Sequence, residues 1–151
     1  MKTMGVGFYW NDLEVGFQFK TVGRTVTETD IINFVNCTGM VEVMFTNVEF
    51  LKSGSSIKGR VAPAALVFGL AEGLLIQSTM QETGLAFLNM ELDVKKPVVA
   101  GDTIHVECEI TEVRATSKGN RGLVRSLNKV VNQKDEVVLT YTPLRLLAGH
   151  D

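Results

Sequence analysis

The hydrophobic pattern is dominated by one stretch, residues 61–75, which is apolar on nearly every side and is interrupted only by the carboxylate of Glu72. A helix that is apolar all round must be covered by other elements. Pro63 suits the first turn of a helix, where its missing N–H is no loss. Gly84 is a suitable place for such a helix to end. The pattern therefore predicts a buried central helix that reaches to about Gly84.

After this point the period changes from helical to alternating. Apolar residues recur at every second position, which is typical of strands with one buried face. Strands are predicted at residues 88–95, 104–111 and 123–131, the last with a poor pattern, and from residue 137 onward. The alternation slips near Glu112 and Val113, which predicts a β-bulge. Pro143 is expected at an edge or a bend.

The first 60 residues are less regular. Residues 13–26 contain a predicted strand, and Thr27 with Asp30 resembles a capping box that starts a short helix, which Gly39 would end. Residues 40–59 show no clear period and contain Ser53-Gly54-Ser55-Ser56, so a loop is predicted there. A helix segregated to one face of an antiparallel sheet is the α+β class. We expect a single domain over residues 1–151.

Composition agrees with an ordinary soluble globular chain. Of the 151 residues, 45% are hydrophobic and 21% are charged, and the net charge of -2 argues against nucleic acid as a partner. The apolar stretch is shorter than the roughly 20 residues of a membrane span. Cys37 and Cys108 match no metal spacing and are expected to be free thiols. With no signal peptide visible, a cytoplasmic location and no metal are expected.

Several motifs resemble those of the MaoC-like dehydratases. Residues 9–16 (Tyr-Trp-Asn-Asp-Leu-Glu-Val-Gly), 25–31 and 34–39 resemble the opening of that family. Residues 96–104 (Lys-Pro-Val-Val-Ala-Gly-Asp-Thr-Ile) resemble its KPV-x-x-GDT turn, and residues 131–133 resemble its NQ hairpin. The resemblance covers almost the whole chain. It implies the hot-dog fold, in which an antiparallel sheet wraps a long helix and two copies pair edge to edge.

The (R)-specific enoyl-CoA hydratases of this family carry a G-D-x-N-P-x-H motif, whose Asp and His activate the water that adds to, or leaves, a 2-enoyl thioester. Aligned on Gly39, Met40 stands at the Asp position and Phe45 at the His position. A thioether and a phenyl ring cannot exchange a proton, and the loss of such a group typically costs about 10²–10⁴ in rate. The resemblance therefore implies an acyl-thioester cleft without the catalytic pair.

Two carboxylates are candidate catalytic replacements. Glu42 lies two residues beyond the Asp position, although a solvated loop carboxylate is the simpler interpretation. Glu72 should have a raised pKa unless it is paired. Some hot-dog thioesterases use a helix carboxylate as base or nucleophile, whereas a structural Glu bonded to backbone amides or to a serine is the simpler alternative. The candidate substrate-binding residues are Met40, Met44, Phe45, Asn47, Pro63 and Ala64.

The leading hypothesis is an acyl-CoA-binding protein with a degenerate hydratase or dehydratase site, and any surviving activity would be that of a hydro-lyase. The alternatives are a non-catalytic hot-dog partner subunit and an acyl-CoA thioesterase that uses Glu72. No cofactor is expected beyond the CoA thioester itself. An unpaired sheet edge invites a partner, so a homodimer or higher homo-oligomer is expected. His150 lies in the terminal tail and is expected to have no role.

Overall fold

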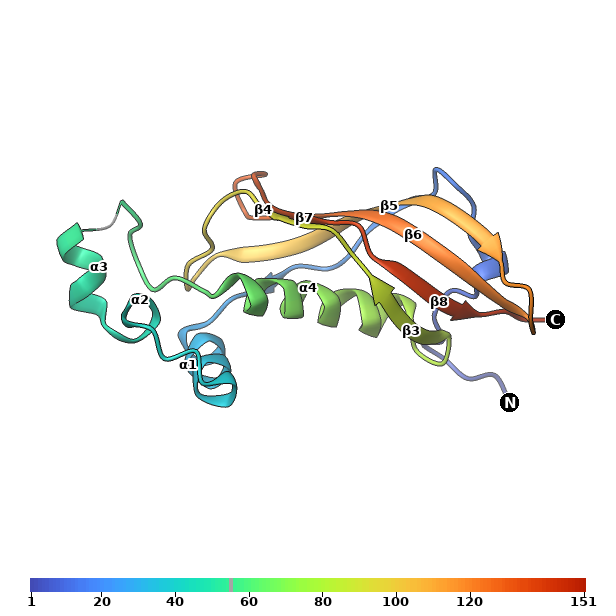
Figure 1. Cartoon of the computed structure of the whole chain (residues 1–151), viewed down its shortest axis with the longest axis horizontal. Coiled ribbons are helices and arrows are strands. Elements are labelled where there is room, and N and C mark those ends of the chain that lie inside the picture. The colour runs from blue at the N-terminus through green and yellow to red at the C-terminus, as the bar shows by residue number, and fades with distance from the viewer. Residues whose placement is uncertain (55) are drawn as a thin grey trace.

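The computed structural model describes residues 1–54 and 56–151, so the predicted loop residue Ser55 lies outside the described residues. Figure 1 shows one long helix, α4 (Ala64–Thr79), lying against a curved antiparallel sheet. The hydrophobic core fills the space between them, and α4 buries Leu66, Val67, Ala71, Leu74 and Leu75 in it. The α+β prediction, with a sheet wrapped around a long helix, is confirmed.

The central helix is shorter than predicted at its C-terminal end. Pro63 is its N-cap, one residue outside the helix, and Met80 is its C-cap, whereas Gly84 begins the next strand. The N-terminal segment explains the early end, because the amide of Phe8 donates to the carbonyl of Thr79 at 2.8 Å. A helix end needs partners for its last carbonyl groups. Here a distant segment supplies one.

Eight strands form the sheet in the described part of the chain. They are β1 (Gln18–Lys20), β2 (Arg24–Thr25), β3 (Gly84–Asn89), β4 (Leu92–Val94), β5 (Thr103–Ala115), β6 (Arg121–Val131), β7 (Val137–Tyr141) and β8 (Leu144–Ala148). The order is β1-β5-β6-β7-β4, with β2 beside β5 and β8 between β6 and β3, and every pair is antiparallel. Pro143 lies at the break between β7 and β8, as predicted.

The two central strands, β5 and β6, differ in how clearly their sequences show the alternation of buried and exposed residues. In β5 every second residue from Ile104 to Ile110 is buried, and the register shifts between Ile110 and Glu112, close to the predicted bulge. Burial in β6 alternates as well, but two of its inward positions are Ser126 and Asn128. Those polar residues gave β6 its poor hydrophobic pattern.

The prediction of a half-buried strand at residues 88–95 is wrong in detail. The segment divides into β3 and β4, and all residues of both strands are exposed. The reason is position, because β3 pairs only with β8 and β4 only with β7, which leaves their outer edge open. The apolar side chains exposed here are Leu85, Phe87, Leu88, Leu92 and Val94.

Helices precede α4 where a loop was predicted. Helix α1 (Glu28–Thr38) has the predicted capping box, with Thr27 and Asp30 bonded reciprocally, and ends at Gly39 with a positive φ of 74°. Helices α2 (Val43–Thr46) and α3 (Val48–Gly54) then occupy much of residues 40–59, so the loop prediction is wrong. Leu51 is the only buried residue of these two helices. Because a single buried position cannot recur every three or four residues, the sequence shows no helical period here.

Candidate functional site

The positions aligned with the catalytic Asp and His lie between α1 and α4, at the end of the molecule that Figure 1 shows on the left. Met40 follows the end of α1 and is 38% exposed. Phe45 lies in α2 and packs, half-buried, against the hydrophobic core. Neither side chain can transfer a proton. Met40 and Phe45 therefore contribute apolar surface here, and their correspondence to the family's catalytic pair stays a prediction.

Arg60 fastens this segment to the rest of the fold. Its Nε donates to Glu28 Oε1 at 2.5 Å, and its Nη1 donates to the carbonyl oxygen of Phe45 at 2.7 Å. The Arg60 carbonyl accepts the amide of Ala100 at 2.9 Å. The Arg60 side chain is 17% exposed, so its bond to the Phe45 carbonyl is partly buried, whereas the Glu28 carboxylate is 57% exposed. One side chain thus connects α1, α2 and the segment that leads into α4.

The other predicted binding residues have different surroundings. Met44 is half-buried in α2, Pro63 is buried, and Ala64 is exposed at the start of α4. Asn47 is already engaged, because its Oδ1 accepts the backbone amides two and three residues ahead at 3.1 and 3.3 Å. That pattern starts α3, so a substrate contact through this oxygen would compete with a structural role.

Glu42 is the N-cap of α2, but its side chain makes no capping hydrogen bond. The residue is exposed, and its backbone carbonyl, rather than its carboxylate, accepts bonds from Phe45 and Thr46. A solvated carboxylate on a loop, the simpler interpretation, fits these surroundings. Its role as a base stays a prediction.

A groove of about 480 Å³ opens beside Arg60, between α1, α3 and residues 57–60. Val48 and Leu51 contribute apolar walls, and Lys52, Lys58, Arg60 and Glu28 contribute charge. The sequence pattern did not single out these basic residues, because they are scattered over two elements. Their signal was the excess of Lys and Arg among residues 52–60, a segment that contains no acidic residue.

The second candidate, Glu72, lies in a buried ion pair. Its Oε1 and Oε2 accept the two Nη groups of Arg145 at 2.5 and 2.8 Å, and Oε1 also accepts the Tyr141 hydroxyl at 2.8 Å. The three residues come from α4, β8 and β7, and each is at least nine-tenths buried. The sequence predicted a partner for this carboxylate, but named backbone amides or a serine in place of Arg145.

These contacts restrict what Glu72 can do. Burial, followed by the charge of Glu72, raises the pKa of Tyr141 far above its ordinary range, so the hydroxyl stays a donor. The Arg145 guanidinium also lies 5.1 Å from the centre of the Phe87 ring, in a cation–π contact. A carboxylate with both oxygens engaged must break its ion pair before it can attack a thioester or accept a proton. The thioesterase hypothesis stays a prediction, and the geometry favours a structural Glu72.

A small cavity lies next to this cluster, between the C-terminal half of α4 and the sheet. Its polar wall includes Ser126 and Asn128, which sequence reasoning missed. The signal that could have found them is the poor alternation of β6, where two polar residues stand at inward positions. Buried polar side chains at such positions are uncommon and call for a partner.

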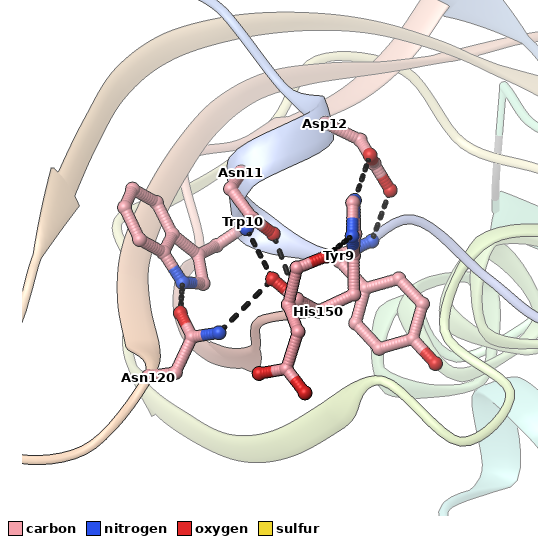
Figure 2. Close-up of polar contacts among 7 residues, drawn as sticks. Tyr9, Trp10, Asn11, Asp12, Asn120 and His150 are labelled. Carbon is pink, nitrogen blue, oxygen red and sulfur yellow. Dashed lines mark hydrogen bonds and ion pairs between the residues drawn. The ribbon is translucent and has the colours of Figure 1, made fainter.

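An Asp–His pair does exist, at the opposite end of the molecule from α1–α3. Figure 2 shows the C-terminal segment held by Asn11, Asp12 and Asn120, and Figure 1 shows both termini at that end. His150 Nε2 lies 2.6 Å from Asp12 Oδ1, and the His150 carbonyl accepts from Asn11 at 2.7 Å and Asn120 at 3.1 Å. The tail is therefore held in place by hydrogen bonds and is not frayed, and the pair lies far from Phe45.

The remaining site predictions concern metals, membranes and thiols. Across residues 1–54 and 56–151, no three His, Cys, Asp or Glu side chains come together as metal ligands would, and no helix has the length and apolar character of a membrane span. Cys37 is an exposed free thiol and Cys108 a buried one, as predicted.

Comparison with known proteins decides the family. A family model described as the FAS1-like dehydratase domain region matches residues 14–141. Protein MaoC from Klebsiella aerogenes is 31% identical over 115 residues, which cover 75% of this chain. The chain belongs to the MaoC-like dehydratase family. It spans only 33%, about a third, of that relative's length.

Solved structures agree with the assignment. The monoamine oxidase regulatory protein from Archaeoglobus fulgidus is 30% identical with a TM-score of 0.84, over 96% of this chain and 97% of that one. A MaoC domain protein dehydratase from Chloroflexus aurantiacus has a TM-score of 0.92 at 23% identity, over 100% of this chain and 43% of that one. The fold is the hot-dog fold that the resemblance implied.

Proposed function

We propose that this protein binds acyl thioesters of the CoA type at the Phe45 end of α4 and does not hydrate them through an Asp–His pair. The observation that carries the proposal is the substitution at the two aligned positions. Met40 and Phe45 provide apolar contact surface there, and neither can hold a proton. The family supplies the expectation of a thioester ligand, and the substitutions remove the usual chemistry.

The groove beside Arg60 supports the choice of ligand. A CoA thioester combines phosphate groups with a long and mostly neutral arm. Lys58 would meet phosphate oxygens, as would Lys52, whose Nζ also pairs with Glu49 Oε1 at 2.9 Å. Val48 and Leu51 offer apolar contact to the arm. A volume of about 480 Å³ falls within the range of ordinary small-molecule sites.

The test measures binding and turnover separately. Calorimetric titration with butyryl-CoA is expected to show saturable binding, about tenfold weaker in a Lys52→Glu/Lys58→Glu variant because phosphate attraction becomes repulsion. Lys95→Glu is the matched control, since Lys95 is half-exposed and pairs with Asp93 elsewhere. Titration that shows no binding by the wild-type chain would contradict the proposal.

Turnover decides between binding protein and enzyme. We expect hydration of crotonyl-CoA to be undetectable or far below the ordinary range of about 1–10³ s⁻¹. Hydration within that range that is lost in Glu42→Gln or Glu72→Gln would replace our proposal with the enzymatic one. Activity that neither substitution changes would mean that other residues carry the proton.

A second candidate function is that of a partner subunit in a larger hot-dog assembly. It is favoured by the open edge of β3 and β4, whose Phe87, Leu88 and Val94 side chains are each more than 40% exposed. Such an edge attracts a second strand. Sedimentation is expected to give a dimer at micromolar concentration, and a species that stays monomeric would contradict pairing. Co-purification of a chain with an intact Asp–His pair would support the subunit role.

A further inference from the structure

The groove beside Arg60 has walls from three segments that lie apart in the sequence, namely α1, α3 and residues 57–60. The α3 wall is held by few apolar contacts. Leu51 is the only buried residue of α2 and α3, and Met44 and Phe45 are half-buried. Segments with few buried apolar contacts open locally at a low free-energy cost. The shape of the groove therefore depends on the other contacts that fasten α2 and α3.

Arg60 forms part of one wall and is bonded to α1 and α2. Its Nε donates to Glu28 Oε1 of α1 at 2.5 Å, and its Nη1 donates to the Phe45 carbonyl of α2 at 2.7 Å. Its own backbone is held by the Ala100 amide, which donates to the Arg60 carbonyl at 2.9 Å. A guanidinium presents its donors in a rigid planar fork. One side chain therefore sets the position of α2 relative to α1.

Asn47 transmits the position of α2 to the α3 wall. It is the single residue that separates the two helices. Its amide donates to the Val43 carbonyl of α2 at 2.9 Å, and its Oδ1 accepts the amides of Glu49 and Phe50 in α3 at 3.1 and 3.3 Å. Because the same residue is bonded to both helices, a displacement of α2 also displaces α3. The α3 side chains that line the groove, including Lys52, move with it.

We propose that Arg60 is the positioning residue of the acyl-thioester site, because its bonds to Glu28 and Phe45 fix the distance between the α1 and α3 walls of the groove. This inference rests on the proposed function. In it, the phosphate groups of the ligand meet Lys52 and Lys58, which are exposed. The Arg60 side chain is 17% exposed, and its charge is opposed by that of Glu28. Arg60 therefore acts on the ligand through the shape of the groove.

A test without ligand measures whether Arg60 holds α2 and α3. In the full chain labelled with ¹⁵N, the NMR order parameters of residues 44–52 are expected to be about 0.85 in the wild type and to fall below about 0.6 in Arg60→Met, which has no donors. Arg24→Met is the matched control and should keep the wild-type values. Arg24 pairs with Asp30 of α1 at 3.0 Å and, in the described part of the chain, has no hydrogen bond to α2.

Two ligands then separate positioning from phosphate binding. Butyryl-CoA carries phosphate groups, whereas butyryl-pantetheine carries the same acyl arm without them. Arg60→Met is expected to weaken the calorimetric binding of both ligands about tenfold, which corresponds to roughly one charge-assisted hydrogen bond. Arg24→Met should bind both ligands as the wild type does. Lys58→Met, by contrast, should weaken the binding of butyryl-CoA alone.

Arg60→Lys keeps the test decisive if Arg60→Met does not fold, because it retains a charge opposite Glu28 without the planar fork. The proposal is overturned by wild-type order parameters already below about 0.6, or by order parameters that the Arg60 variants leave unchanged. It is also overturned if those variants weaken the binding of butyryl-CoA alone or of neither ligand. A wild-type chain that binds no butyryl-CoA would contradict the proposed function alone, because the order parameters measure the hold of Arg60 on the groove without any ligand.

Discussion

Two carboxylates near α4 have opposite surroundings. Glu42, at the start of α2 beside the N-terminal end of α4, is exposed and its carboxylate makes no cap contact. In the C-terminal half, Glu72 is buried, with both oxygens engaged by Arg145 and one by Tyr141. Access to water decides what each can do, because an exposed carboxylate stays charged without a partner whereas a buried one must be paired. The exposed carboxylate of Glu42 is therefore solvated, whereas the buried carboxylate of Glu72 is held in an ion pair.

The largest expected effect tests the buried pair. Arg145→Met leaves Glu72 charged and unpaired in the core, so urea unfolding should show a loss of about 3–5 kcal/mol. Arg114→Met is the control, because Arg114 pairs with Glu112 at the surface, where such pairs contribute about 0–1 kcal/mol. A loss below 1 kcal/mol in Arg145→Met would contradict the contrast between the exposed and the buried carboxylate.

A double variant sharpens the same point. Glu72→Met/Arg145→Met removes both charges and should recover much of the stability lost in Arg145→Met, because no uncompensated charge remains. Equal losses in the single and double variants would mean that shape, rather than charge, accounts for the effect.

The second prediction restores proton-handling groups at the other end. Met40→Asp/Phe45→His returns the residue types of the family's catalytic pair, and positioned acid–base groups typically contribute about 10²–10⁴ in rate. We expect crotonyl-CoA hydration at least about 100-fold above the wild-type rate. Met40→Asn/Phe45→Gln has a similar shape without the titratable groups and should stay at the wild-type rate. An increase in both variants would point to a change of shape.

The third prediction concerns α1, which carries Glu28, the partner of Arg60. Thr27→Ala removes the side-chain oxygen that accepts the Asp30 amide at 3.0 Å, and should lower the free energy of unfolding by about 1 kcal/mol. Thr29→Ala, two residues further on and exposed, should change it by less than about 0.5 kcal/mol. Urea unfolding measures both, and similar losses would show that the cap does not stabilise this end.

The smallest effect concerns the half-exposed Asp12–His150 pair, and depends on pH. Its hydrogen bond raises the pKa of His150 above 6.5 and lowers the pKa of Asp12 below 3.8. The stability that the pair adds is present between about these two values. It is lost as pH rises through the folded pKa of His150 and as pH falls through that of Asp12. His150→Gln should therefore lower the Tm at pH 5 and change it little at pH 9. A difference that grows with pH would contradict the pairing.

Prediction from the sequence succeeded where the signal is local. Thr27, Asp30 and Gly39 specify the ends of α1 through neighbouring backbone groups, and the alternation in β5 follows directly from one buried face. It failed for α2 and α3, where burial of Leu51 alone leaves no period to read. The same holds for the candidate site. The sequence alone shows that positions 40 and 45 carry no titratable side chain. The groove beside Arg60 could not be predicted, because it forms between elements that meet only in the folded chain.

By itself, the sequence determined that a wholly apolar helix must be wrapped by alternating strands, and that Met40 and Phe45 cannot exchange protons. These properties belong to side-chain chemistry and short-range spacing. Only the tertiary structure decided that Glu72 pairs with Arg145, 73 residues away, and that Arg60 joins Glu28 of α1 to the carbonyl of Phe45. Strand order and register decide which residues become partners across a sheet. Both arise from packing of the whole chain, so no short stretch of sequence predicts them.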